Sequence, residues 1–253
     1  MIRLKNINVV LDGKKILQNI DLTIQDKEIL VIIGSSGSGK STLLRLIIGL
    51  LQPSSGEIWV NDCEISKISE DDLNKIRLGM GMVFQYSALF DSMSVGENVA
   101  FSLRQHTKLP DQKIKEIVKE KLGLVDLRGI EAAMPKSLSG GMKKRVSLAR
   151  AIANNPHIVL YDEPTSGLDP INSRIIDQLI LNTRQAIGAT AIIVTHDIES
   201  AFTIADRIVM LDAGCIIAAG TVAEIKKSTD PLVAKFINYS TLSTKLRSPG
   251  KED

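Results

Sequence analysis

A glycine-rich segment near the N-terminus constrains the fold more than any other part of the chain. It reads Gly34-Ser-Ser-Gly-Ser-Gly-Lys-Ser-Thr42 and fits the pattern G-x-x-x-x-G-K-[ST]. An apolar run over 29–33, typical of a buried strand, precedes it, and an apolar helical pattern follows from Thr42. Glycines let successive backbone N–H groups turn inward on an anion, and the following helix adds its positive end. The segment therefore predicts a strand–loop–helix unit that binds a polyphosphate.

Every residue of this segment is a candidate contact for a nucleotide. We expect Lys40 to reach the β- and γ-phosphates and the Ser41 hydroxyl to ligate Mg²⁺. The predicted contacts are Gly34, Ser35, Ser36, Gly37, Ser38, Gly39, Lys40, Ser41 and Thr42.

Length and composition exclude several classes of protein. The 253 residues suffice for one large domain, or for a domain with an inserted subdomain. The net charge is +2 with well-mixed signs, so the composition gives no argument for a nucleic-acid partner. The two distant cysteines suggest neither a metal site nor a disulfide and suit a reducing cytosol. We expect no signal peptide and no membrane span, so any membrane part must come from other chains.

The order of predicted elements is typical of an α/β protein. Strand patterns fall at residues 2–10, 15–24, 29–33, 57–60, 80–84, 158–161, 191–195, 206–211 and 215–219. From 88 to 154, helical patterns replace them. We therefore predict a mostly parallel sheet covered on both faces, interrupted by a helical segment.

Polar residues stand at the ends of several predicted strands. Gly34, Gln85, Asp162 and His196 each follow an apolar run, at the carboxyl end where open α/β sheets bind their ligands. We expect these four segments to converge on one site. Asp162 is a candidate ligand of nucleotide Mg²⁺, and Glu163 beside it is the candidate general base. His196 is expected to position the γ-phosphate and the attacking water.

A second glycine motif, Leu138-Ser-Gly-Gly-Met142, begins another helical pattern. Ser139 is a candidate N-cap, and basic residues follow the motif. These features predict a second anion-binding helix start. The helical segment separates this motif from the phosphate loop, so the motif is not part of the first cradle.

The complete set of motifs, in this order, resembles that of an ABC-transporter ATPase over roughly residues 1–228. The motifs are 34–42, Gln85, 138–145, 158–163, Ser166-Gly-Leu-Asp169 and His196. The resemblance implies an α/β P-loop NTPase (RecA-like) core with an antiparallel β subdomain and an inserted α-helical signature subdomain. The core would comprise 1–87 and 155–228, and the helical subdomain 88–154. A short C-terminal helix and a polar tail would follow at 229–253.

The resemblance also implies a homodimer packed head to tail around ATP and Mg²⁺. Ser139, Gly140 and Gly141 of one copy would contact the nucleotide held by the phosphate loop of the other. Asp169 would link the two sites, and Gln85 would sense Mg²⁺ and the water. ATP would close the dimer and hydrolysis would reopen it, driving a membrane partner between two states. The implied catalytic residues are Glu163, His196 and Gln85, and the implied metal ligands are Ser41, Gln85 and Asp162.

Three stretches resemble, more narrowly, the ATPase of the Mla/MCE-associated phospholipid transport system. They are residues 84–99, 104–110 and 139–145. Met142 stands where Gln is common in the wider family and is expected in this branch. The resemblance implies maintenance of outer-membrane lipid asymmetry, an integral-membrane permease dimer, and MCE-domain and STAS-domain partners. The chain would lie on the cytoplasmic face of the inner membrane, bound through the permease.

The segment after Gln85 is where this family docks a coupling helix of its permease. The candidate docking residues are Leu89, Phe90, Met93 and Val95. The same side chains could instead belong to the core of the helical subdomain.

Two other functions remain open at this point. One is the ATPase of a different ABC transporter, for solute import or lipoprotein export. The other is a soluble ABC ATPase, of which iron–sulfur assembly is the main candidate, because the repair and translation classes usually carry long insertions or two cassettes.

One feature departs from the family pattern. The family usually places an aromatic residue near position 10, where it stacks on adenine. This chain has no aromatic residue before Trp59, so Val10 or Leu11 would offer only apolar contact. We expect modest discrimination between nucleotide bases.

Overall fold

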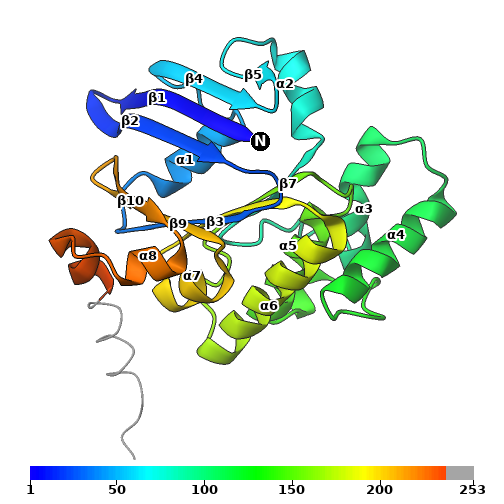
Figure 1. Ribbon diagram of the computed structural model, residues 1–253. Helices are drawn as coiled ribbons and strands as arrows, with labels where there is room; N and C mark the ends of the chain where they lie inside the picture. Colours follow the sequence, from blue (N-terminus) through cyan, green and yellow to red (C-terminus); the bar gives the residue numbers. More distant parts are fainter. Residues whose placement is uncertain (238–253) are drawn as a thin grey trace, which may run out of the picture.

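Two β-sheets and the helices around them make up the computed structural model, which describes residues 1–237 (Figure 1). The predicted polar tail beyond residue 240 lies outside the described residues. Within residues 1–237, no helix has the length and apolar character needed to cross a membrane.

The smaller sheet is antiparallel and has four strands in the order β2-β1-β4-β5. Its strands are β1 (Ile2–Leu11), β2 (Lys14–Ile24), β4 (Ser55–Val60) and β5 (Cys63–Glu64). The predicted hairpin at the N-terminus is confirmed, because β1 pairs antiparallel with β2 from Ile2↔Ile24 to Leu11↔Lys14.

The larger sheet has six strands in the order β10-β9-β3-β8-β7-β6. Its strands are β3 (Ile29–Gly34), β6 (Met80–Val83), β7 (Ile158–Asp162), β8 (Thr190–Thr195), β9 (Arg207–Asp212) and β10 (Cys215–Gly220). All neighbouring pairs are parallel except β9 and β10, which form the predicted C-terminal hairpin. The mostly parallel sheet is therefore confirmed.

Helices connect the strands of the larger sheet. They are α1 (Lys40–Ile47), α2 (Glu70–Arg77), α3 (Val95–His106), α4 (Asp111–Leu124), the 3₁₀ turn η1 (Pro135–Ser137), α5 (Gly140–Ala151), α6 (Pro170–Ile187), α7 (Ile198–Ile204) and α8 (Val222–Lys226). Both α3 and α4 fall between β6 and β7 in the chain and stand to one side of the sheet (Figure 1). The subdomain boundaries at 87/88 and 154/155 stay predictions.

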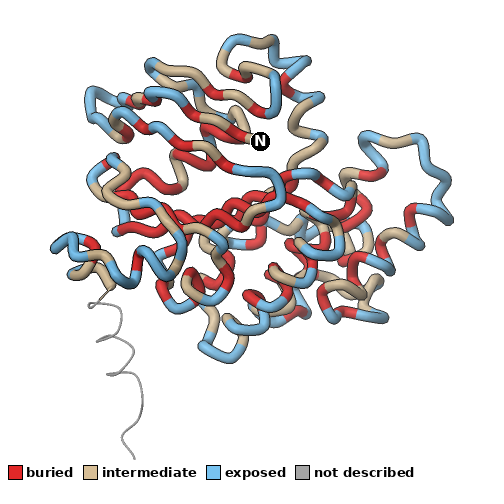
Figure 2. The backbone as a smooth tube through the Cα atoms, viewed as in Figure 1, coloured by how far each residue is buried: buried red, intermediate tan, exposed pale blue. Residues whose placement is uncertain are grey.

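The larger sheet is buried on both faces, as β3 illustrates. All six residues of β3 are buried (Figure 2). Its side chains alternate between two core clusters: Ile29, Val31 and Ile33 belong to the cluster that also contains side chains of α3, α5 and α6, whereas Leu30 and Ile32 belong to the cluster with α1 and the antiparallel sheet. This two-sided burial explains why the sequence of β3 is a continuous apolar run and not an alternating one.

Gly81 in β6 fixes the distance between the larger sheet and α5. A Cβ atom at Gly81 would lie 2.2 Å from the carbonyl oxygen of Ala151, the last residue of α5. Only a hydrogen atom fits there, so the C-terminal end of α5 rests directly on the strand that leads to Gln85.

Gly81→Ala is expected to lower the free energy of unfolding by about 2–3 kcal/mol, because the added methyl group overpacks a backbone contact. Gly123→Ala in α4 is the matched control, since its Cβ would meet only the Arg128 side chain at 3.8 Å. Alanine has a higher helix propensity than glycine, so the control is expected to keep or slightly raise the free energy of unfolding. Urea unfolding measures both, and equal stability of the two variants would contradict the packing argument.

Candidate active site

The phosphate loop takes a conformation that only glycine adopts easily at two positions. Gly37 and Gly39 have φ of 82° and 103°. A Cβ at Gly39 would also lie 2.6 Å from the Leu17 side chain, so glycine is needed there for space as well. Gly39 is the N-cap of α1, whose first turn carries no acidic residue. The positive end of α1 therefore faces the loop, as the sequence predicts for a phosphate cradle.

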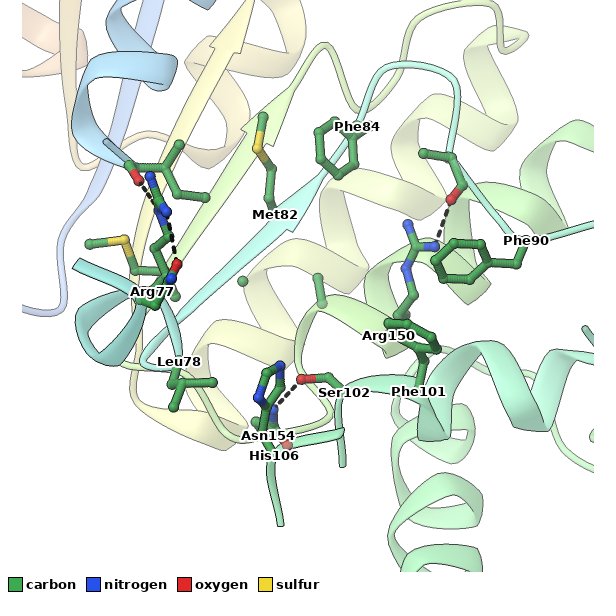
Figure 3. A pocket seen from close by; sticks show the side chains of 16 residues that line it. Arg77, Leu78, Met82, Phe84, Phe90, Phe101, Ser102, His106, Arg150 and Asn154 are labelled. Atoms are coloured by element: carbon green, nitrogen blue, oxygen red, sulfur yellow. Dashed lines mark hydrogen bonds between the residues drawn. The ribbon is translucent and has the colours of Figure 1, made fainter. Parts of the chain in front are cut away.

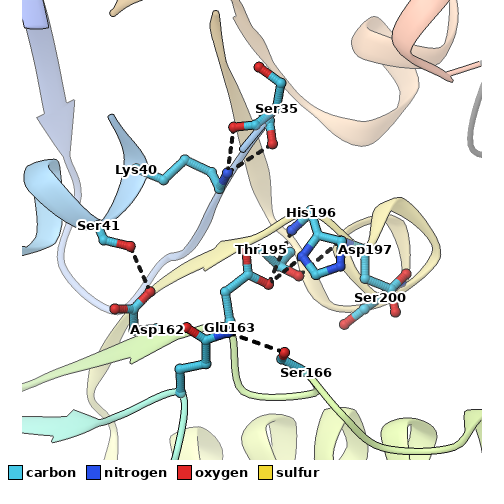
Figure 4. A network of polar contacts seen from close by, with 12 residues as sticks. Ser35, Lys40, Ser41, Asp162, Glu163, Ser166, Thr195, His196, Asp197 and Ser200 are labelled. Carbon is cyan, nitrogen blue, oxygen red and sulfur yellow. Dashed lines mark hydrogen bonds and ion pairs between the residues drawn. The ribbon is translucent and has the colours of Figure 1, made fainter. Parts of the chain in front are cut away.

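Lys40 lies in this cradle with its ammonium group folded back over the loop (Figure 4). Its Nζ donates to the carbonyl oxygens of Gly34 and Ser35, both at 2.9 Å. Burial lowers the pKa of Lys40, while the nearby charges of Glu163 and Asp162 oppose that shift. A buried cation held by neutral carbonyls suits the binding of a phosphate, which would add the negative charge that the loop itself lacks.

The other residues of the loop differ in accessibility. Ser36 and Gly37 are exposed, while Ser41 and Thr42 are half-buried. Ser35 Oγ donates weakly to Asp212 at 3.4 Å. The Ser38 hydroxyl is buried and has no hydrogen-bond partner within residues 1–237. An unpartnered hydroxyl inside the cradle is consistent with a loop shaped for a ligand.

Ser41 and Asp162 meet as the sequence predicts. Ser41 Oγ donates to Asp162 Oδ1 at 3.0 Å (Figure 4), although the two residues are 121 positions apart. Both offer oxygen ligands, which Mg²⁺ prefers, and Mg²⁺ at phosphate sites typically takes only one or two protein ligands. In the described part of the chain, no group of three or more His, Cys, Asp or Glu residues could hold a metal by itself. The pair therefore fits a magnesium ion that also binds phosphate oxygens.

Glu163 and His196 form the second predicted pair of the site. Glu163 Oε2 lies 2.8 Å from His196 Nδ1 and also accepts from the His196 backbone N–H at 3.3 Å. The Glu163 side chain is 12% exposed and that of His196 is 63% exposed. Glu163 has φ of 48°, a left-handed conformation that is uncommon for a residue with a side chain. Strain of this kind often accompanies functional residues.

Gln85 reaches the same site from β6. Its Nε2 donates to Ser166 Oγ at 3.4 Å, a long bond that leaves the amide side chain weakly held. The predicted convergence of Gly34, Gln85, Asp162 and His196 is thus observed at one edge of the larger sheet.

Lys144 is a residue of this site that the sequence reasoning missed. It is 6% exposed, and its ammonium donates to the main-chain carbonyl of Gln85 and, at 3.3 Å, to that of Glu163. In the sequence, Lys144 is one of several basic residues that follow the second glycine motif. A signal was available, because Lys144 lies at helical spacing from the buried residues Ser147 and Leu148.

The second glycine motif lies beside the Asp169 turn. Ser139 caps α5 by accepting from the Met142 N–H at 3.3 Å. A Cβ at Gly141 would lie 3.1 Å from Asn172 Oδ1, while Gly140 is exposed. Within residues 1–237, no hydrogen bond joins Ser139, Gly140 or Gly141 to the phosphate loop. The motif is therefore presented at the surface, as a site shared between two copies requires.

Asp169 has a local role that was not predicted from the sequence. Its carboxylate caps α6 by accepting from the N–H groups of Ile171 and Asn172, both at 3.0 Å. The Asn172 side chain, followed by these backbone bonds, lowers the pKa of Asp169. Asp169 thus holds the start of α6 whether or not it also reaches a second copy.

A buried polar link, also missed from the sequence, joins α6 to the turn that carries His196. Ser200 Oγ donates to Asp177 Oδ1 at 2.5 Å, and Asp197 accepts from the Ser200 N–H at 3.1 Å. Burial raises the pKa of Asp177 to about 6. The link fixes the helix after His196 against the helix that Asp169 begins.

An apolar groove of about 780 Å³ opens beside the segment that follows Gln85 (Figure 3). Its lining includes Leu78, Met82, Phe84, Phe90, Phe101 and Arg150. Of the four candidate docking residues, Phe90 lines the groove, and Leu89 packs against the core. Val95 is fully buried where α3 begins, so for this residue the structure favours the alternative left open by the sequence, a place in the core.

Comparison with known proteins gives consistent results. A family model described as ABC transporter matches residues 17–166. The intermembrane phospholipid transport system ATP-binding protein MlaF of Haemophilus influenzae is 42% identical over 94% of this chain and 90% of its own length. The probable ribonucleotide transport ATP-binding protein mkl of Mycobacterium tuberculosis is also 42% identical, over 89% of this chain, but this match covers 63% of its length. A dimeric post-hydrolysis structure of the ATP-binding cassette MJ0796, bound to ADP and Pi, has a TM-score of 0.80 at 33% identity, covering 88% of this chain and 99% of that one.

The hairpin that carries the position expected for an adenine-stacking aromatic packs against the phosphate loop. Gly39 packs against Ile16 and Leu17 of β2, and Leu11 pairs with Lys14 at the same end of the hairpin. Val10 and Leu11 are 44% and 40% exposed, so either could touch a base.

Leu11→Tyr is expected to tighten ATP binding several-fold, because stacking on a base contributes about 1 kcal/mol or more. The variant should also reduce the ability of GTP to compete. Leu11→Ala is the matched control and should change the Kd for ATP by less than about twofold, since it removes only apolar contact. Equilibrium dialysis with ATP and competing GTP measures both effects. An unchanged Kd in Leu11→Tyr would remove Leu11 from the base-binding position.

Proposed function

Since this chain belongs to the ABC transporter family, we propose that it is the ATP-hydrolysing subunit that drives phospholipid transport across a bacterial envelope. Two copies would work as a head-to-tail dimer on the cytoplasmic face of the inner membrane. The transport would maintain the lipid asymmetry of the outer membrane.

The similarity to MlaF carries the lipid part of this proposal. That similarity extends over nearly the whole of both chains, whereas the match to mkl leaves more than a third of mkl uncovered. The two relatives are equally identical to this chain, so transport of a soluble substrate such as a ribonucleotide is the second candidate.

The proposed chemistry is attack of water on the γ-phosphate of ATP. The loop 34–42 would hold the phosphates through its N–H groups, and Lys40 would add a positive charge. Ser41, Asp162 and Gln85 would hold Mg²⁺, which when bound neutralises charge on the phosphate oxygens.

Glu163 and His196 would act on the water itself. Glu163 has a carboxylate that is mostly shielded from solvent, and His196 approaches it to 2.8 Å. Glu163 would accept the proton of the water, and His196 would hold the water and the γ-phosphate in line. The left-handed backbone at Glu163 supports this assignment, because strained backbone conformations cluster at functional sites.

A second copy would complete the site. Ser139, Gly140 and Gly141 would bind the γ-phosphate held by the other copy, through N–H groups at the start of α5. Their surface position and their separation from the chain's own phosphate loop support this arrangement. Asp169, which lies beside these residues, would link the two nucleotide sites across the interface between the copies.

The proposed partners are a permease dimer, an MCE-domain protein and a STAS-domain protein, with no nucleic acid. The groove near Phe90 would receive a short apolar helix of the permease, because aromatic and apolar side chains line it. Phe90 is 40% exposed there, and the centroid of its ring lies 4.8 Å from that of the Phe101 ring.

Glu163→Gln is expected to lower ATP turnover by a factor of about 10²–10⁴, because the amide cannot accept the proton of the water. ATP binding should persist, and the variant should form an ATP-dependent dimer in size-exclusion chromatography with light scattering. Glu199→Gln, an exposed carboxylate on the neighbouring helix α7, is the matched control. Hydrolysis at the wild-type rate in Glu163→Gln would remove Glu163 from the role of base.

Affinity purification of the tagged chain, produced together with its neighbouring genes, tests the transport assignment. We expect an integral-membrane permease and an MCE-domain protein to co-purify. Phe90→Glu should reduce the recovered permease by about tenfold, since a charge placed at an apolar contact removes an anchor. Leu109→Glu, at an exposed site outside the groove, is the control. Recovery of a solute permease without an MCE-domain protein would favour the second candidate.

A further inference from the structure

The strands β6 and β7 end in matching positions. They are parallel neighbours, and their last paired residues are Val83 and Tyr161. Gln85 and Glu163 each stand two residues beyond that pair. Both residues of the site that are proposed to contact the water therefore occupy equivalent positions, just where the ladder between their strands has ended.

Lys144 joins the two strands at this point. Its buried ammonium donates to the Gln85 carbonyl and, at 3.3 Å, to the Glu163 carbonyl. In a continuing sheet, backbone N–H groups would bind such carbonyls. Here the Lys144 ammonium, from α5, donates to the carbonyls in place of backbone N–H groups. The ammonium therefore sets the separation between the main chains of Gln85 and Glu163.

Glu163 is consequently held from two sides. Its carbonyl accepts from Lys144 at 3.3 Å and from the Ser166 N–H at 3.1 Å, and its N–H donates to the Val194 carbonyl at 2.9 Å. These bonds fix both ends of a residue whose φ is 48°. The side chain then has few directions available, and it lies against His196 Nδ1. Loss of the Lys144 bond would leave the Glu163 carbonyl with the Ser166 N–H alone and would remove its link to the Gln85 main chain.

The helix that carries Lys144 is itself fixed to the same segment. Its end at Ala151 rests on Gly81, and Arg150 donates to the carbonyls of Ser87 and Ala88 at 2.9 and 2.6 Å. Ser87 and Ala88 also have positive φ, of 62° and 47°. Two cations of α5 thus bind the main chain on either side of Tyr86, which is 86% exposed.

We propose that Lys144 is a positioning residue for ATP hydrolysis, which sets the distance between Gln85 and Glu163 by binding both of their carbonyl groups. This role rests on the function proposed above. Lys144 does not touch the substrate, and it acts through the two residues whose main chains it holds.

Lys144→Met tests the proposal in the full-length chain, because it keeps the apolar stem and removes the donors. We expect kcat to fall about 10–100-fold, as for a small misplacement of catalytic groups, with the KM for ATP within about threefold of wild type. Lys144→Gln keeps an amide NH₂ group that can donate hydrogen bonds and should recover part of the rate. Lys143→Met removes the neighbouring, less buried lysine and should leave kcat unchanged.

Hydrogen exchange followed by mass spectrometry gives a readout that does not depend on turnover. In Lys144→Met, amides in peptides covering 84–89 and 163–166 should exchange faster, while those of β3 and β9 should not change. Faster exchange throughout the chain would mean that Lys144 only stabilises the core, and would overturn the proposal. So would a wild-type kcat, or unchanged exchange in 84–89 and 163–166.

The outcomes also separate this proposal from the proposed function. Failure of the wild-type chain to bind ATP in equilibrium dialysis would reject the function, and the positioning role with it. Normal ATP binding and hydrolysis in the wild type, together with normal hydrolysis in Lys144→Met, would reject the positioning role alone.

Discussion

The parallel register of the larger sheet is the constraint on which the site depends. Ile33 pairs with Thr195, Asp162 with Val194, and Val83 with Tyr161. The residues that follow these pairs must therefore emerge along one edge. A shift of one residue in any of these strands would turn its buried side chains to the opposite face, so the apolar packing on both sides also fixes the position of the polar residues. The geometry of the site is in this sense a consequence of how β3, β6, β7 and β8 are buried.

Two buried lysines balance the carboxylates at this edge. Lys40 and Lys144 both bind main-chain carbonyls, and burial lowers the pKa of each, while the charges of Glu163 and Asp162 oppose the shift. Burying unpaired charges of either sign would be costly, and the carbonyl groups and the opposite charges offset that cost. Lys40 stands on the phosphate side and Lys144 on the side of Gln85. The carboxylates are therefore held between cations before any nucleotide binds.

The parts of the fold and site that could be predicted from the sequence are those marked by a short motif or by a regular apolar pattern. The phosphate loop, the apolar strands and the pairing of Ser41 with Asp162 follow from motif and period, and the structure brings them together. Lys144 and Asp177 were missed because a buried charged side chain depends on distant partners that periodicity does not reveal. The place of Val95 stayed open for a related reason, since an apolar residue at the start of a helix can face a core or a partner. The capping of α6 by Asp169 was visible in principle, because Asp before Pro170 is a common helix start.

The short segment from Gln85 to Phe90 joins the edge of the sheet to the groove. Gln85 lies at the site, and Phe84 and Phe90 line the groove. Ser87 and Ala88 in this segment are consecutive residues in the left-handed conformation. Lys144 and Arg150 bind its main-chain carbonyls, so the backbone has little freedom to absorb a displacement. A partner that moved Phe90 would therefore displace Gln85 or break a bond to α5. Ser139 caps the start of α5, so in the proposed dimer either outcome would also move the residues that the other copy's nucleotide would contact. Under the proposed function, coupling between transport and hydrolysis would need no long pathway, because α5 and the turn after Gln85 lie between the groove and the site.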